Sequence, residues 1–157
     1  MPVTVWIDAD ALPSTLKDYL LKVLRVRQVL GVFVANQPIT LPSHPLFQSV
    51  QVGQGADVAD AYIVEHAQAG DLAVTQDIPL ADLLMAQGVS VLNLQGQAFT
   101  QANMKSRLAV RDLLYDLRSA GIATKGPKPF DVKQKQAFMN GFDKALTACL
   151  KHQTDQK

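Results

Sequence analysis

Five aspartates lie where predicted strands or helices meet loops, and their type and spacing could support metal-ion chemistry. They are Asp8, Asp10, Asp57, Asp60 and Asp77. Two carboxylates ~4 Å apart repel each other by about 4 kcal/mol at an effective dielectric constant near 20. A converged group of them would therefore take up protons or hold a divalent cation. Ligation by oxygen atoms alone favours Mg²⁺ or Mn²⁺ over Zn²⁺.

Whether these side chains converge depends on the order of strands and helices along the chain. Apolar alternation and turn residues predict strands at 3–7, 32–35, 47–52, 72–75 and 89–92. They predict helices at 13–29, 57–69 and 79–87, ended by Gly31, Gly70 and Gly88. This order, β-α-β-β-α-β-α-β, predicts an α/β fold with a mostly parallel sheet of five strands.

The carboxyl ends of parallel strands share one edge of a sheet, so the acids after the first and fourth strands can converge there. Asp57 and Asp60 are three residues apart and share a helix face. Asn36 and Thr75, also at strand ends, could position water or phosphate. Structural alternatives remain open, because Asp57 could be a helix N-cap and Asp77 a turn or N-cap residue.

The last third of the chain has a different character. Residues 1–100 carry 4 Lys and Arg against 9 Asp and Glu, whereas residues 101–157 carry 11 against 5. Two further helices are predicted, at 100–120 and 131–150, within a single domain of residues 1–150 followed by a disordered tail at 151–157. A basic surface beside a cation site suits a polyanionic partner such as nucleic acid. Equally, the charge partition could only dock the two parts of the chain against each other.

Five basic residues in this part are candidate phosphate contacts: Arg107, Arg111, Arg118, Lys125 and Lys128. The three arginines lie within a narrow stripe of the 100–120 helix, between two apolar faces. They could pair with the aspartates, bind phosphates or remain solvated. The lysines lie in a loop that could follow a nucleic-acid backbone, although plain solvation is the simpler reading.

Composition excludes several classes of protein. A chain with 48% hydrophobic and 18% charged residues is typical of a globular domain. No apolar run approaches the roughly 18 residues of a membrane-spanning helix, and no signal peptide is recognisable. A single cysteine, Cys149, fits a reducing cytoplasm. The three histidines lack metal-ligand spacing, and no nucleotide-binding glycine loop or hydrolase serine motif occurs.

Several motifs in combination resemble a known family. They are Asp8-Ala-Asp10-Ala-x-Pro13, Val34-Ala-Asn36-Gln37, Gly55-Ala-Asp57-Val-Ala-Asp60, Thr75-Gln-Asp77-Ile-Pro-Leu80 and Arg107-Leu-x-x-Arg111-Asp112. Together they resemble the bacterial YaiI/YqxD family, related to the PIN-like nucleases. The resemblance implies a PIN-like three-layer α/β/α fold with a carboxylate site for Mg²⁺ or Mn²⁺. PIN-like relatives are typically nucleases and often work in an assembly, so a homo-oligomer is possible.

Three hypotheses about function follow. The first is a metal-dependent nuclease, cutting RNA or single-stranded or structured nucleic acid, with Asp8, Asp10, Asp60 and Asp77 as catalytic residues. The second is a phosphatase or phosphotransfer enzyme in which an aspartate of the Asp-x-Asp pair acts as nucleophile. The third is a non-catalytic nucleic-acid or protein-binding module in which the acidic cluster is structural.

Overall fold

A computed structural model describes residues 2–10, 12–53, 58–100 and 132–155, together with the helical positions 103, 109, 110, 112, 113, 115 and 117. The strands are β1 (Thr4–Asp8), β2 (Leu30–Ala35), β3 (Phe47–Gln51), β4 (Leu72–Val74) and β5 (Ser90–Leu92). The helices bounded within the described residues are α1 (Ser14–Arg27), α2 (Val58–His66), α3 (Ile78–Ala86) and α5 (Val132–Asp155). All strand pairs are parallel, in the order β3-β2-β1-β4-β5. The predicted α/β class and element order are confirmed.

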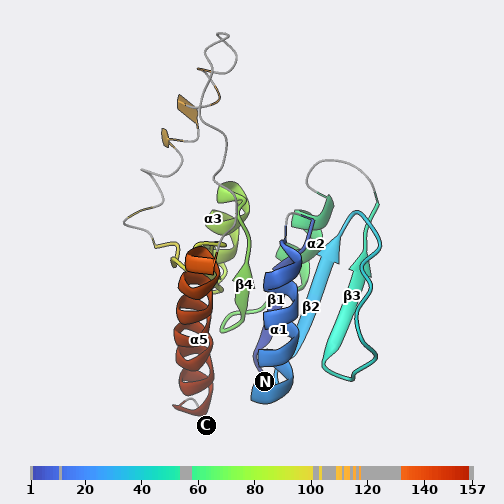
Figure 1. Cartoon of the computed structure of the whole chain (residues 1–157). Helices are drawn as coiled ribbons and strands as arrows, with labels where there is room; N and C mark the ends of the chain where they lie inside the picture. The colour runs from blue at the N-terminus through green and yellow to red at the C-terminus, as the bar shows by residue number, and fades with distance from the viewer. Residues whose placement is uncertain are drawn as a thin grey trace.

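The sheet forms the middle of three layers. Figure 1 shows α1 and α5 side by side over one face of the sheet, and α2 and α3 over the other. In β1, Val5 and Ile7 belong to the α1/α5 core, whereas Trp6 belongs to the α2/α3 core. Because both faces are covered, the three central residues Val5, Trp6 and Ile7 are all apolar and buried, as expected for a central parallel strand.

The predicted end of the first helix is wrong. The helix ends at Arg27, where Gln28 adopts a left-handed conformation with φ of 57° and caps it. Gly31 instead lies within β2. A Cβ atom on Gly31 would collide with Cδ1 of Leu24, a fully buried residue of α1. Glycine is therefore required here because the helix packs closely on the strand, and not because the helix stops.

The connection from β2 to β3 contains no helix, although the two strands are parallel. Residues 36–46 cross over the sheet as a loop that contains three prolines. Ile39 and Leu41 from this loop pack against the α1/α5 core. The loop therefore covers part of the sheet face that a crossover helix would cover in a regular unit.

The last helix begins at Val132 and continues to Asp155, so residues 151–155 are helical where the sequence predicts a disordered tail. Its buried side chains recur with helical spacing: Phe138, Phe142, Leu146 and Cys149. Gly141 approaches the turn at Gly96 so closely that a Cβ on either glycine would collide with the other segment's backbone. This contact fixes α5 against the turn that follows β5. None of the helices in the described ranges has the length and apolar content needed to cross a bilayer.

The strand order reverses direction at β1. From β1 the chain moves outward to β2 and β3, and then returns to β4 and β5 on the other side of β1. In open parallel sheets, ligands bind at the carboxyl edge where such a reversal occurs. The boundary between β1 and β4 is therefore the place to look for a site.

Candidate active site

The side chain of Asp8 lies at this boundary, at the carboxyl end of β1. The hydroxyl of Thr75, which directly follows β4, donates a 2.9 Å hydrogen bond to Oδ2 of Asp8. Burial raises the pKa of the Asp8 carboxyl above its ordinary value; the Thr75 hydrogen bond opposes this shift, and the negative charges of Asp10 and Asp77 add to it. Asp8 is therefore a partly buried acid beside two like charges.

Thr75 also fixes the next acid along the chain. Its hydroxyl oxygen accepts a 3.0 Å hydrogen bond from the backbone N–H of Asp77. Thr75 is only 2% exposed. Because the hydroxyl of Thr75 donates to Asp8 and accepts from Asp77, this buried side chain orients both acids. The predicted role of Thr75 in positioning water or phosphate stays a prediction.

Asp77 is the N-cap of α3, with Pro79 in the first turn. Its Oδ1 accepts a 2.8 Å hydrogen bond from the N–H of Leu80. The N-cap interpretation of Asp77 is therefore confirmed. Because a carboxylate has two oxygen atoms and about four acceptor positions, this single bond leaves Asp77 able to act as a ligand as well.

Asp10 ties the ends of the first two strands together. Its two carboxylate oxygens accept the backbone N–H of Asn36 at 2.9 and 3.1 Å. The side-chain amide of Asn36 in turn donates a 2.8 Å hydrogen bond to the carbonyl oxygen of Gly53, after β3. Both predicted residues thus lie at the carboxyl edge, where they link three neighbouring strands.

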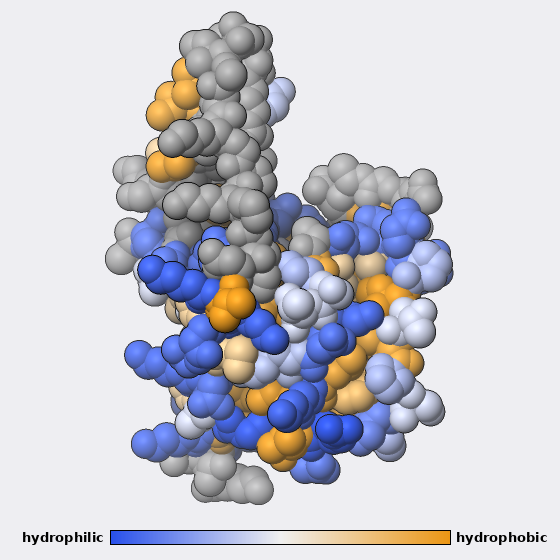
Figure 2. Space-filling model, viewed as in Figure 1, coloured by the Kyte–Doolittle hydropathy of each residue, from blue (hydrophilic) through white to orange (hydrophobic). Residues whose placement is uncertain are grey.

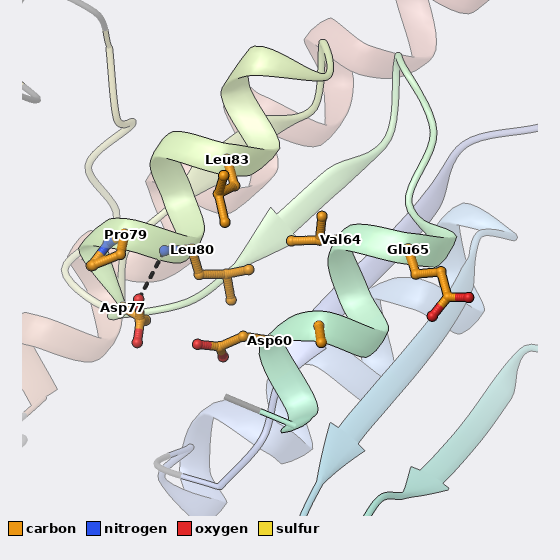
Figure 3. Close-up of a pocket in the computed structure, with 8 residues that line it drawn as sticks. Asp60, Val64, Glu65, Asp77, Pro79, Leu80 and Leu83 are labelled. Atoms are coloured by element: carbon orange, nitrogen blue, oxygen red, sulfur yellow. Dashed lines mark hydrogen bonds between the residues drawn. The ribbon is translucent and has the colours of Figure 1, made fainter. Parts of the chain in front are cut away.

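Asp60 reaches the same region from α2. A groove of about 640 Å³ runs between α2 and α3, with Asp60 and Asp77 among its lining residues. Figure 3 shows the carboxylate of Asp60 directed across this groove toward Asp77, while Glu65 points away from both. The apolar walls of the groove are formed by Ala61, Val64, Pro79, Leu80 and Leu83.

The carboxylates share one edge of the sheet without forming a closed metal cage. Within the part of the chain that the structure describes, no three His, Cys, Asp or Glu side chains are grouped closely enough to hold a metal ion. Asp57 lies outside the described residues, as do Arg107, Arg111, Arg118, Lys125 and Lys128. A site built from all five aspartates, and the basic contacts to phosphate, therefore stay predictions.

The available donors nevertheless suit a hard divalent cation. Asp8, Asp10 and Asp77 present only oxygen atoms, which Mg²⁺ and Mn²⁺ prefer. Asp8 is partly buried near two further negative charges, and no Lys, Arg or His side chain of the described residues pairs with these three carboxylates. A cation held by one or two carboxylates and water is the usual arrangement for Mg²⁺.

The structure also contains a buried acid that the sequence interpretation missed. Asp71, at the amino edge of β4, is 6% exposed. Its carboxylate accepts hydrogen bonds from Thr4 N–H at 3.1 Å, from the Trp6 indole at 2.9 Å and from Gln68 N–H at 3.0 Å. These bonds join β1, β4 and the loop before β4, so Asp71 has a structural role. Its only sequence signal is its place after Gly70, which a helix stop explains equally well.

Fold and site together define an α/β protein with an acidic site at the β1/β4 boundary. Residues 6–148 match the model of the "Uncharacterized BCR, YaiI/YqxD family". A UPF0178 protein of Myxococcus xanthus is 46% identical over 147 residues, which cover 94% of this chain and 96% of the relative. UPF0178 proteins of Psychromonas ingrahamii and Dechloromonas aromatica are 45% and 44% identical, covering 92% and 90% of this chain and 95% of each relative.

The chain therefore belongs to the YaiI/YqxD family, as its motifs indicate. No solved structure is significantly similar to it. The wider relation to PIN-like nucleases stays a prediction from the motifs.

Proposed function

We propose that this protein is a nuclease that depends on a divalent cation, Mg²⁺ or Mn²⁺, and hydrolyses phosphodiester bonds. The observation that carries this proposal is the state of Asp8, a partly buried carboxylate at the β1/β4 boundary beside the charges of Asp10 and Asp77. Such an arrangement is electrostatically unfavourable by itself, and a bound cation would relieve it. Acids whose pKa is shifted by burial and by nearby charges are often functional for this reason.

Each carboxylate has a distinct part in the proposed site. Asp8 and Asp10 would hold the cation from the β1 side, and Asp77 from the β4 side. Asp60 would complete the set from the α2 side, with Asp57 as a further proposed ligand. When bound, Mg²⁺ or Mn²⁺ supplies activation of water and neutralisation of charge that develops on the phosphate.

Neighbouring residues orient Asp8 and Asp10 by hydrogen bonds. Thr75 fixes the rotamer of Asp8 through its hydroxyl, and Asn36 holds Asp10 through its N–H. The groove between α2 and α3 gives one side of the site an apolar wall, against which part of a nucleotide could pack. Asp8 and Asp10 are thus already oriented, which reduces reorganisation during reaction.

The charge distribution supports nucleic acid as the substrate, and we propose that it is RNA. The site lies in the acidic part of the chain, and five basic residues between positions 107 and 128 would bind the phosphodiester backbone. Arg107, Arg111 and Arg118, with Lys125 and Lys128, remain the proposed contacts. The resemblance of the motifs to PIN-like nucleases supports the same class of substrate.

The geometry favours this proposal over a phosphatase with an aspartyl nucleophile. In that mechanism the second acid of the Asp-x-Asp pair must be available as a proton donor and acceptor. Here the carboxylate of Asp10 accepts the N–H of Asn36 and so links β1 to β2, while its remaining lone pairs can still bind a cation. A carboxylate held as an acceptor in this way suits cation ligation better than proton donation.

A cleavage assay tests the proposal. Purified protein, stripped of metal and then supplied with Mn²⁺, is incubated with single-stranded RNA, single-stranded DNA and duplex DNA. We expect cleavage of single-stranded RNA by the wild type and its loss in Asp8→Asn. Asp82→Asn, which removes an exposed acid of α3 outside the groove lining, is the matched control and should remain active. Cleavage that persists in Asp8→Asn, or none by the wild type on any substrate, would overturn the proposal.

A further inference from the structure

The positive charges of the acidic part of the chain are all on one helix. Residues 1–100 contain four Lys and Arg residues, and all of them belong to α1: Lys17, Lys22, Arg25 and Arg27. The same helix carries only one acid, Asp18. Hydrophilic side chains cover much of the face that α1 presents in Figure 2. The four cations differ in whether they have partners within the protein.

Two of the four have structural partners. The ammonium group of Lys17 donates a 3.4 Å hydrogen bond to the carbonyl of Thr40, which holds the β2–β3 loop against the helix. Arg27 forms a 2.9 Å ion pair with Asp143 of α5 and a 3.1 Å hydrogen bond to Thr147. These contacts account for the first and last cations of α1.

Lys22 and Arg25 differ from them. Both are exposed, and neither side chain has an ion-pair or hydrogen-bond partner within the described part of the chain. Both line a pocket of about 280 Å³ between α1 and the β2–β3 loop. Its other lining residues are Asp18, Leu21, Pro42, Ser43, His44 and Phe47.

The imidazole of His44 in this pocket has a fixed orientation. Its Nδ1 accepts a 3.1 Å hydrogen bond from the N–H of Leu46, and its ring packs on that of Phe47 with centroids 4.8 Å apart. The carbonyl of His44 also accepts the N–H of Phe47 at 3.1 Å. Because Nδ1 is the acceptor, the ring proton is carried by Nε2, which becomes a donor to any ligand in the pocket.

We propose that this pocket binds a phosphate group, supplied by a nucleotide or by a nucleic-acid backbone. A guanidinium, an ammonium, an imidazole N–H and the Ser43 hydroxyl form a set of donors suited to phosphate oxygens. The volume equals roughly nine water molecules, which is enough for a phosphate group. The pocket is separate from the candidate cation site, since Phe47 begins β3 at the amino edge, whereas Asp8 ends β1 at the carboxyl edge. This proposal is therefore independent of the proposed nuclease activity.

Binding of two ligands to full-length protein, in low salt with EDTA, tests this site. Calorimetry measures the Kd for inorganic phosphate and for a single-stranded 10-nucleotide RNA, on wild type and on Lys22→Gln/Arg25→Gln. We expect the double variant to weaken binding about tenfold or more, because two charge-assisted contacts are lost. Asp18→Asn should tighten binding by about threefold, since it removes a repelling charge. Lys151→Gln, which removes an exposed cation from the far end of α5, should change nothing.

The two ligands distinguish the source of the phosphate. Saturable binding of inorganic phosphate that the double variant loses supports a site for a small phosphate ligand. RNA binding that is far tighter than phosphate binding, and equally sensitive to the double variant, supports a backbone contact. The proposal is overturned if the wild type binds neither ligand, or if the double variant binds both as the wild type does. Because every substituted residue is exposed, circular dichroism is expected to show an unchanged fold.

Discussion

The hydroxyl of Thr75 donates to Oδ2 of Asp8 across the boundary between β4 and β1, at a distance of 2.9 Å. The same hydroxyl accepts the backbone N–H of Asp77. One buried side chain thus sets the position of two acids that are far apart in sequence. The boundary is also the point where the strand order reverses, which is where open parallel sheets bind ligands.

Removal of this hydroxyl should destabilise the protein. In Thr75→Val the N–H of Asp77 loses its acceptor inside the protein, and we expect the free energy of unfolding to fall by about 1–3 kcal/mol. Thr75→Ser keeps the hydroxyl and should lose less. Urea denaturation measures both variants. Equal stability of Thr75→Val and wild type would show that the hydrogen bond contributes nothing.

When divalent cations are absent, the difference in stability between Asp8→Asn and the wild type should depend on pH. The raised pKa means that folding favours the protonated Asp8. Its stabilising contribution is therefore complete below the ordinary pKa of 3.8 and is lost as the pH rises through the higher pKa of the folded state. At neutral pH the neutral variant should have the higher Tm.

Thermal unfolding in EDTA, from about pH 3 to about pH 8, measures this difference between Asp8→Asn and wild type. The advantage of the variant should shrink steadily as the solution becomes more acidic. A lower Tm for Asp8→Asn at neutral pH would mean that the carboxylate stabilises the fold, contrary to its raised pKa.

Asp71→Asn should show that Asp71 stabilises the fold, unlike the aspartates of the candidate cation site. The asparagine keeps one carbonyl oxygen for three N–H donors that now share the two oxygens of Asp71. We expect a loss of about 2–4 kcal/mol in the free energy of unfolding, because bonds to a charged group are strong. Fluorescence of Trp6, the only tryptophan, reports the change directly. Stability within experimental error of the wild type would rule out this role.

Gly31→Ala should disturb the contact between β2 and α1. The added methyl group would collide with Leu24, and we expect a loss of about 1–3 kcal/mol from overpacking. Leu24→Ala opens space at the same place, so the double variant should be less destabilised than the sum of the two single variants. Strict additivity in urea denaturation would show that the two residues are not coupled.

Much of the fold could be predicted from the sequence because its signals are local. Apolar alternation marks the strands, and Gly88, with φ of 87°, follows the C-cap of α3 as glycine allows. The predicted helix stop at Gly70 is wrong, because α2 already ends at His66 and Gly70 lies in the turn before β4. The end of α1 could not be read in this way. Gln28 adopts the left-handed conformation without being glycine, and Gly31 is required by packing on Leu24, a contact that only the folded chain reveals.

The candidate site divides in the same way. Asp8 and Asp77 could be placed together because parallel strands share a carboxyl edge. The hydrogen bond from Thr75 to Asp8 could not be predicted, because it depends on burial and on side-chain rotamers that no sequence pattern encodes. The pocket of Lys22, Arg25 and His44 was not recognised because His44 is far from the two cations in sequence and meets them only when the β2–β3 loop packs on α1.

The most direct test of the proposed cation site is a Mn²⁺ titration of metal-free protein by calorimetry. Wild type, Asp8→Asn and Asp82→Asn are compared under the same conditions. We expect saturable Mn²⁺ binding by the wild type and by Asp82→Asn, and loss of this binding in Asp8→Asn. Absence of Mn²⁺ binding by the wild type, or equal affinity in Asp8→Asn, would contradict it.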